Sequence, residues 1–330
     1  MVFKSRIWEL GSALHLSSAK RPGRELSAKT YAIHYLKMIE RFLEYLSVER
    51  RYAPNTVISY RKDLSDFSIF LLETESHQDF SAVSKKVIRN FMVELSEQKI
   101  SKRSINRKLS SLRSFFLFLM KLGEIKTSPL EGIKSLKFYA EKQIPFSKEE
   151  MDQLALAEEQ MPESDLLKEL VIETLYQTGM RRMELCNLLL ENVDFGKKEI
   201  KVIGKGNKER IIPFSEHLSE KFQSYLLERN PLRESEMYFF VTKKGNKLYD
   251  KFVYSAVNSY LSLVTSKEKK SPHILRHSFA THVLENGAEI SKVKKLMGHS
   301  SLASTQVYTN ANIEQLKKVF NSAHPRAKKM

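Results

Sequence analysis

Near its carboxyl end the chain reads LMGHSSLASTQVY from Leu296 to Tyr308, which places His299 nine residues before Tyr308 across a polar turn. A lone histidine or tyrosine in such a place usually serves packing, and the chain has 13 tyrosines. The pair becomes a candidate for chemistry only if other reactive side chains accompany it. The sequence upstream supplies them.

Three upstream motifs carry further charged side chains. They read GMRRMEL over residues 179–185, GKGNKER over residues 204–210 and HILRH over residues 273–277. A phosphodiester is negatively charged, so a protein that breaks one without a metal must hold fixed positive charge around its oxygens. Arginine suits this role because its planar fork pairs with two oxygens and keeps its charge. Two arginines, two histidines, a lysine and a tyrosine could therefore surround one phosphodiester.

Each candidate also has a plainer interpretation. The first arginine is either Arg181 or Arg182, and an arginine-rich turn is more often surface than site. Lys205 lies between glycines, which let a backbone approach a ligand closely, so it could donate a proton to a leaving oxygen. The alternative is a basic hairpin tip that touches phosphate without catalysis. The second arginine, Arg276, follows His273 by three residues and shares its helical face.

A metal site is not expected. His273, His277 and His282 fall in one predicted helix, but at these offsets three histidines do not share one face. The single cysteine, Cys186, lies in an apolar pattern typical of a buried helical position. We therefore expect no metal and no cofactor, and we interpret His277 and His282 as structural or supporting side chains.

The composition indicates a protein that binds a polyanion. Lys and Arg total 55 against 39 Asp and Glu, a formal net charge of +16, and nucleic acid is the commonest polyanion. The alternative is a basic soluble protein without such a partner. One cysteine excludes a disulfide framework and suits a reducing cytoplasm. No apolar run approaches transmembrane length and no secretory signal is recognisable, so we expect a cytoplasmic protein.

Apolar spacing divides the 330 residues into two domains. Residues 1–34 are polar and basic without sustained periodicity, and they are predicted to form a flexible extension. Four stretches with helical spacing follow within residues 35–122, enough for one small bundle. Residues 123–139 contain the glycine, proline and lysines typical of a linker. The second domain is predicted over residues 140–322, and residues 323–330 form a basic tail.

The fold class is predicted to be mainly α with a small β component, and the strands belong to the second domain. The pattern Ser147-Lys148-Glu149-Glu150 is a capping box that begins the first helix of that domain. Short strands are predicted at residues 193–194, 199–203, 210–213 and 238–241, with a hairpin turn at residues 204–207.

Basic side chains outside the reactive set are candidates for phosphate contacts on DNA. The second and fourth predicted helices carry several, and residues four apart, such as Arg103 and Arg107, share a helical face. An ordinary solvated face is the alternative. The candidates are Arg61, Lys102, Arg103, Arg107, Lys208 and Arg210.

The order and spacing of the motifs resemble the active site of the tyrosine recombinases, most closely the bacterial Xer recombinases. Lys205 follows Arg181 by 24 residues, and GKGNKER is nearly identical to the corresponding motif of Xer recombinases. The family places its first arginine three residues before an acid, here Glu184, which favours Arg181 over Arg182. The resemblance extends over about residues 35–325. It implies that the catalytic residues are Arg181, Lys205, His273, Arg276, His299 and Tyr308.

The resemblance also implies a fold and a reaction. A helical, SAM-like core-binding domain and a mixed α/β catalytic domain would form a C-shaped clamp on duplex DNA. Tyr308 would attack phosphorus to form a 3′-phosphotyrosyl link and release a 5′ hydroxyl, while the two arginines and His299 hold the transition state. Lys205 would act as general acid, with His273 assisting proton transfer. Since the phosphotyrosyl bond stores the cleaved linkage, neither ATP nor a metal is required.

For a Xer recombinase the implied role is the resolution of chromosome dimers at a short dif-like site before cell division. The working unit would be a tetramer, formed with a second Xer recombinase or with copies of itself, and a septal DNA translocase would be a further partner. Two alternatives stay open. One is an integrase of a mobile element or phage with the same chemistry, and the other is a DNA-binding protein without catalysis.

The two ends of the chain raise separate expectations. Residues 1–34 have no recognisable counterpart in the family, so translation is expected to start later, with Met38 a candidate. The basic ending HPRAKK over residues 324–329 resembles one branch of the Xer group. An apolar stripe precedes it, which either packs on its own domain or, as the resemblance implies and as we expect, docks on a neighbouring subunit. The stripe consists of Ile313, Leu316, Val319 and Phe320.

Overall fold

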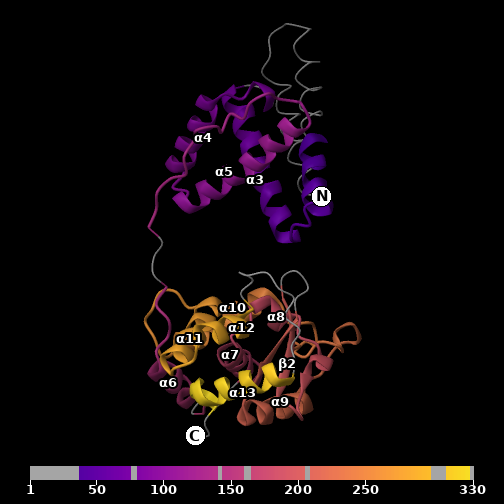
Figure 1. The fold of residues 1–330 in the computed structure, drawn as a ribbon, viewed down its shortest axis with the longest axis vertical. Coiled ribbons are helices and arrows are strands. Elements are labelled where there is room, and N and C mark those ends of the chain that lie inside the picture. The colour runs from indigo at the N-terminus through magenta and orange to yellow at the C-terminus, as the bar shows by residue number, and fades with distance from the viewer. Residues whose placement is uncertain are drawn as a thin grey trace. The chain divides into compact units, whose positions relative to one another are not determined.

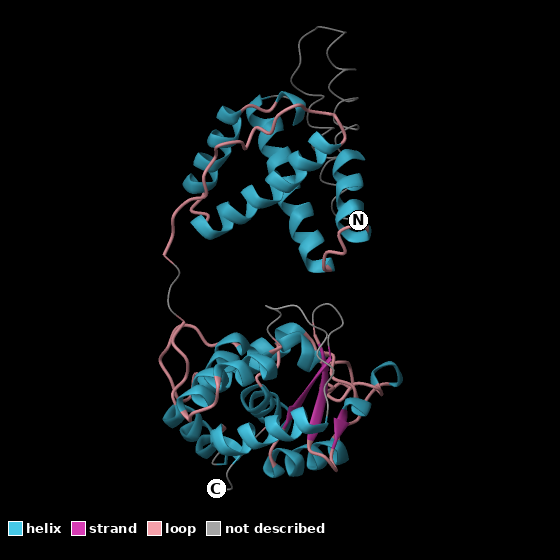
Figure 2. Cartoon of the chain, viewed as in Figure 1, coloured by secondary structure: helices cyan, strands magenta, loops and turns pink. Residues whose placement is uncertain are grey.

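The computed structural model describes residues 37–75, 80–139, 143–159, 165–204, 209–298 and 310–327. The chain divides into two compact units at residues 140 and 141 (Figure 1). Within the described residues, helices make up most of both units, and the β-strands lie in the second (Figure 2). This is the predicted fold class, mainly helical with a small β component.

The first unit is a bundle of helices. It contains a helix over residues 37–48, α3 (Pro54–Glu75), the short η2 (Phe80–Ala82), α4 (Lys85–Glu97) and α5 (Lys102–Lys121). Serines begin the last two helices: the hydroxyl of Ser84 accepts the N–H of Val87, and the hydroxyl of Ser101 accepts that of Ser104. The four predicted helices are confirmed.

Phenylalanines fill the centre of this bundle. Phe42 from the first helix, Phe67 from α3, Phe91 from α4, and Phe115 and Phe116 from α5 are each at most 2% exposed. The rings of Phe67 and Phe91 meet edge to face with centroids 5.0 Å apart, a favourable arrangement. Since burial of each such side chain contributes about 1.5–3 kcal/mol, the unit has a substantial core of its own.

A buried carboxylate ties α3 to α5. Asp63 on α3 is fully buried, accepts a hydrogen bond from the hydroxyl of Ser111 at 2.7 Å and forms an ion pair with Arg107. The Nζ of Lys108 lies 3.4 Å from its other oxygen. A buried charge without partners is costly, which explains why three donors of α5 gather around it.

Helix α7 (Leu166–Thr178) lies at the centre of the second unit, and most of its residues are buried. It packs against α9 (Glu216–Glu228), α10 (Asp250–Leu261) and α11 (Pro272–Glu285). Tight contact with three helices requires apolar side chains on most of its faces, and the sequence LLKELVIETLYQT supplies them.

The predicted capping box begins α6 (Lys148–Glu159). The hydroxyl of Ser147 accepts the N–H of Glu150 at 3.1 Å, and the carboxylate of Glu150 accepts the N–H of Ser147 at 2.7 Å. The second unit therefore starts its first helix where the sequence places it.

Three short antiparallel strands form the sheet, in the order β1 (Val193–Asp194), β2 (Glu199–Ile203) and β3 (Glu209–Pro213). The register pairs Ile200 with Ile212 and Val202 with Arg210. These four side chains are buried, so one face of the β2–β3 hairpin turns toward the interior. All three strands agree with the prediction.

The fourth predicted strand, at residues 238–241, is wrong. Isolated bridges pair Tyr238 with Leu189 and Val241 with Lys247, and no ladder continues from them. Phe239 and Phe240 are neighbours in sequence and both are buried, whereas a half-buried strand alternates between core and solvent. Packing of two adjacent aromatic rings therefore decides the local backbone here.

Helix α13 (Asn310–Ala323) packs on its own unit, against β3, α11 and α12 (Ile290–Met297). Leu316 joins a buried cluster with Phe279 and Val283 of α11 and Leu296 of α12. Phe320 is also buried. The expectation that this stripe docks on a neighbouring subunit is therefore wrong for these two side chains, because their apolar surface is already covered inside the unit.

The residues after α13 do not form a free basic tail up to residue 327. His324 is buried, and its ring stacks on that of Phe320 with centroids 5.1 Å apart. Its Nδ1 accepts the N–H of Arg326 at 3.1 Å, so the Nε2 carries the hydrogen and donates to the carbonyl of Tyr176 at 3.2 Å. Burial lowers the pKa of His324 to about 3, which keeps the ring neutral. The Nη2 of Arg326 donates to the carbonyl of Met151 at 2.8 Å.

Candidate active site

A glycine turn between α7 and α8 (Arg182–Cys186) sets the position of Arg181. Gly179 ends α7 with φ 58°, a left-handed conformation that favours glycine. A Cβ at this position would lie 2.4 Å from the ring of Phe279 on α11, so a larger residue would force the two helices to shift. Arg181 follows directly before α8 in extended conformation, with its side chain 41% exposed.

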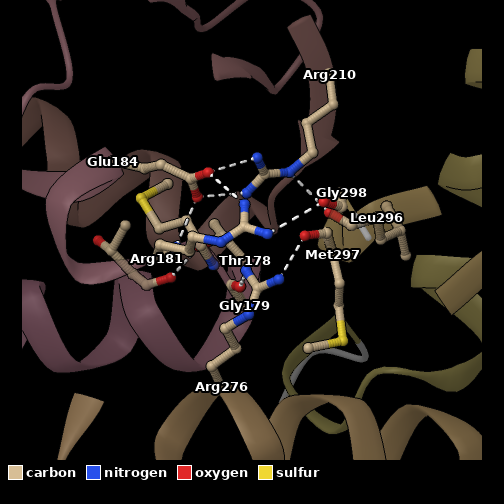
Figure 3. A network of polar contacts seen from close by, with 11 residues as sticks. Thr178, Gly179, Arg181, Glu184, Arg210, Arg276, Leu296, Met297 and Gly298 are labelled. Atoms are coloured by element: carbon tan, nitrogen blue, oxygen red, sulfur yellow. Dashed lines mark hydrogen bonds and ion pairs between the residues drawn. The ribbon is translucent and has the colours of Figure 1, made fainter. Parts of the chain in front are cut away.

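Glu184 of α8 joins two arginines (Figure 3). Its Oε2 accepts the backbone N–H of Arg181 at 2.6 Å, and its Oε1 accepts from the Nη1 of Arg181 at 2.8 Å. Arg210 of β3 donates to both carboxylate oxygens, at 2.8 and 2.6 Å. Burial alone would raise the pKa of Glu184, but hydrogen bonds and charge from Arg210 and Arg181 outweigh it and lower the pKa to about 2.

Arg276 reaches the same place from α11. It is 5% exposed and donates to the carbonyl of Gly179, a contact between residues 97 positions apart, and to the carbonyl of Met297. Burial, together with the charges of Arg181 and Arg210, lowers the pKa of Arg276 to about 10. Arg276 therefore stays charged at neutral pH, and the two predicted arginines lie in one network.

The carboxyl end of α12 accepts a hydrogen bond from each of three arginines (Figure 3). The donor and acceptor pairs are Arg210 with Leu296 at 2.9 Å, Arg276 with Met297, and Arg181 with Gly298 at 3.1 Å. The last carbonyls of a helix lack partners within it and carry partial negative charge, so they suit cationic donors. The residue that follows is His299.

His273 lies on α11 one turn before Arg276 and is exposed. Partial burial and the positive charges of Arg276 and His277 lower the pKa of His273, which favours the neutral ring. His282 is buried further along the helix, with its Nδ1 2.8 Å from the hydroxyl of Tyr176.

Half of the predicted catalytic set lies outside the described residues. Arg181, His273 and Arg276 are described, and the structure brings the two arginines together. Lys205, His299 and Tyr308 are not described, nor is the DNA-contact candidate Lys208. Described neighbours flank them: β2 and β3 pair up to Ile203 and Glu209, and the carbonyl of Gly298 belongs to the network.

The choice between Arg181 and Arg182 has a structural basis. Arg182 forms an ion pair with Asp250 at the start of α10. Arg181 donates to both Glu184 and Gly298. The geometry thus favours Arg181 as the first arginine.

The candidates for DNA contacts differ in how exposed their side chains are and in whether they form ion pairs within the protein. Lys102 and Arg103 at the start of α5 are exposed, whereas Arg61 and Arg107 form ion pairs with Glu40 and Asp63. Arg210 is 3% exposed, so its prediction as a DNA contact is wrong. The residue pairs with Glu184 and the end of α12 because its strand face turns inward.

Sequence reasoning missed that role of Arg210 and the contribution of backbone carbonyls. The motif GKGNKER places several basic residues in a row, and nothing in it distinguishes the buried one. The alternation of β3 offers a partial signal, since Arg210 shares a strand face with the buried Ile212. Glu184 was visible only as the acid three residues after Arg181.

Within the described residues, no three or more His, Cys, Asp or Glu side chains gather in a way that could hold a metal ion. In the same residues, no helix combines the length and apolar character needed to cross a membrane.

Comparison with known proteins identifies the family. Residues 145–315 match the Phage integrase family, and residues 39–123 match the Phage integrase N-terminal SAM-like domain. The chain belongs to the phage integrase family of tyrosine recombinases. It is a site-specific DNA recombinase that acts by transesterification.

The relatives carry the name tyrosine recombinase XerC. The protein from Haemophilus influenzae (strain Rd) is 33% identical over 294 residues, which cover 89% of this chain and 99% of the relative. The protein from Chlorobaculum tepidum is 37% identical over 316 residues, covering 87% of this chain and 94% of the relative. The chain is therefore XerC-like. Its basic ending over residues 324–329, which resembles one branch of the Xer group, agrees with this.

Solved structures share the fold. The XerH site-specific recombinase bound to a palindromic difH substrate has a TM-score of 0.63 at 20% identity, covering 86% of this chain and 94% of that one. A lambda integrase dimer bound to a COC′ core site has a TM-score of 0.65 at 15% identity, covering 82% and 98%. At these identities the likeness concerns the fold.

Proposed function

We propose that the chain resolves chromosome dimers by recombination at a dif-like site, with Arg181, Lys205, His273, Arg276, His299 and Tyr308 as catalytic residues. The observation that carries the assignment is the meeting of Arg181 and Arg276 at the end of α12. They come from different helices and donate to the carbonyls of Gly298 and Met297, directly before His299. Fixed positive charge thus gathers at the last described residues before His299 in the chain.

The proposed chemistry follows from this charge. Tyr308 attacks phosphorus and forms a 3′-phosphotyrosyl bond, while the bond from phosphorus to the 5′ oxygen breaks. Arg181, Arg276 and His299 stabilise the negative charge that develops on the non-bridging oxygens. Lys205 donates a proton to the 5′ oxygen, and His273, whose lowered pKa favours the neutral ring, assists proton transfer. Attack by a 5′ hydroxyl on the phosphotyrosine reverses these steps and rejoins the strand.

The proposed partners follow from similarity to XerC. The substrate is duplex DNA, consistent with the net charge of +16 and with the DNA complexes among the related folds. The working assembly is a heterotetramer with a XerD-like recombinase, or a homotetramer, in contact with a septal DNA translocase. The protein acts in the cytoplasm during chromosome partition.

Sequencing the DNA that becomes covalently attached to the protein in dividing cells tests this role. Dimer resolution predicts one short chromosomal site, and its deletion should produce filamentous cells. Attachment at the ends of a mobile element would contradict the proposal and favour the integrase alternative. Absence of attached DNA would also contradict the proposal and would favour the alternative of a DNA-binding protein without catalysis.

A further inference from the structure

Arg210 is buried more deeply than a direct DNA contact allows. Its side chain donates to both oxygens of Glu184 and, through Nε, to the carbonyl of Leu296 at 2.9 Å. A Cβ added to Gly298 would lie 3.1 Å from the Cδ of Arg210, so the glycine lets the chain pass close against this side chain. Every part of the guanidinium is thereby engaged inside the unit.

We propose that Arg210 is a positioning residue for recombination. By holding both oxygens of Glu184 together with the end of α12, it keeps the Arg181 side chain available to the phosphate. It also fixes the backbone from which His299 follows. The inference rests on the proposed role of Arg181 in binding phosphate.

Competition for Glu184 is the first reason. The Arg210 side chain makes two contacts with this carboxylate, and the Arg181 side chain makes one, at 2.8 Å. Two parallel hydrogen bonds between arginine and carboxylate are stronger than one, and a buried carboxylate needs a counter-charge. Without Arg210, the guanidinium of Arg181 would take the second oxygen and turn away from the phosphate.

The connections of Arg210 are the second reason. Its backbone lies in β3, next to Glu209, the first residue of that strand. Its side chain ends at Leu296, three residues before His299. One side chain therefore ties β3 to the end of α12, and its loss would loosen that connection.

Two substitutions of Arg210 and one of Glu184 test the proposal. The substrate is a nicked duplex that carries the site recovered from covalent complexes in cells. Single-turnover cleavage and the Kd for one site are measured on purified full-length protein, with Tm as the check on folding. Arg210→Met should slow cleavage by about 10²-fold while changing Kd by less than about twofold. Arg210→Lys, which keeps the charge but loses the fork, should be intermediate.

The decisive variant combines Glu184→Gln with Arg210→Met. Removal of the carboxylate charge releases Arg181, so the double variant should cleave about tenfold faster than Arg210→Met alone. A double variant no faster than Arg210→Met would overturn the proposal, because it would mean that Arg210 only stabilises the fold. A loss of DNA affinity as large as the loss of cleavage would also overturn it.

Two controls keep the outcomes distinct. If Arg210→Met does not fold, Arg210→Lys with and without Glu184→Gln gives the same comparison. Arg181→Ala is measured beside them. Normal cleavage by Arg181→Ala would mean that the proposed phosphate site itself is wrong, whereas slow cleavage by Arg181→Ala with normal cleavage by Arg210→Met would contradict the positioning role alone.

Discussion

At the scale of single residues, the site depends on charged side chains that hydrogen bonds and ion pairs hold in place. Arg276 is almost fully buried, yet its two terminal nitrogens donate to carbonyls of Gly179 and Met297. Arg181 is partly exposed and shares Glu184 with Arg210. Such an arrangement fixes positive charge before the substrate binds, so these side chains need to reorganise little during the reaction.

Substitution of the arginines should therefore distinguish side chains that act in catalysis from a side chain that does not. Arg181→Ala and Arg276→Ala should each lower the rate of DNA cleavage by roughly 10²–10³-fold, the usual loss for one transition-state donor. Arg182→Ala is the matched control from the same turn and should lose far less, since Arg182 pairs with Asp250 instead. Single-turnover cleavage of nicked DNA provides the measurement. A greater loss in Arg182→Ala would show that the first arginine has been assigned to the wrong residue.

Glu184 makes stability depend on pH in a predictable direction. Its pKa is about 2 in the folded protein and about 4.3 in an unfolded chain, so its stabilisation is present above about pH 4.3 and is lost as pH falls toward 2. The linked contribution is roughly 3 kcal/mol. Urea unfolding of wild type and Glu184→Gln should differ most at pH 7 and least near pH 2.5. The exposed Glu234→Gln serves as control, and a gap independent of pH would contradict the account.

At the scale of elements, α7 and α11 meet through a glycine. Gly179 combines a left-handed φ with a contact in which a Cβ would lie 2.4 Å from Phe279. The sequence places a glycine in the motif GMRRMEL, which suggests a turn, but the contact with Phe279 is not visible without the fold. Periodicity of apolar residues predicts the helices and the hairpin. It fails at Phe239 and Phe240, where tertiary packing overrides the alternation of buried and exposed side chains.

Gly179→Ala should be much more harmful than substitution of an unconstrained glycine. Gly287 lies just after the end of α11 and has a φ of 89°. Nothing lies within 4 Å of a Cβ placed there. Gly287→Ala should therefore lose about 1 kcal/mol through backbone strain alone. Gly179→Ala adds a steric clash and should lose at least about 2–3 kcal/mol and most of its cleavage activity. Equal losses in urea unfolding would show that the contact with Phe279 is unimportant.

At the scale of the whole molecule, the chain consists of two units with separate hydrophobic cores. The charge, the two-part organisation and the order of the motifs are all legible in the sequence. The inward direction of Arg210 and the docking of α13 on its own unit are not, because both depend on contacts between segments distant in the chain.

Deletion of residues 1–34 should leave both units intact. The segment lacks a sustained apolar stripe in sequence, so it has little surface to bury. Recombination on a plasmid with two sites should change by less than about twofold. Thermal unfolding checks the fold, and a fall in Tm of more than a few degrees would show that the segment packs on one of the units.

Isolation of the covalent DNA complex identifies the nucleophile of the reaction. Wild-type protein incubated with a nicked site should trap DNA on one peptide, and mass spectrometry should locate the phosphodiester on the oxygen of Tyr308. Tyr308→Phe keeps the ring and loses the attacking oxygen, so it should bind the same DNA and form no adduct. An adduct on another residue, or one of normal yield with Tyr308→Phe, would contradict the account.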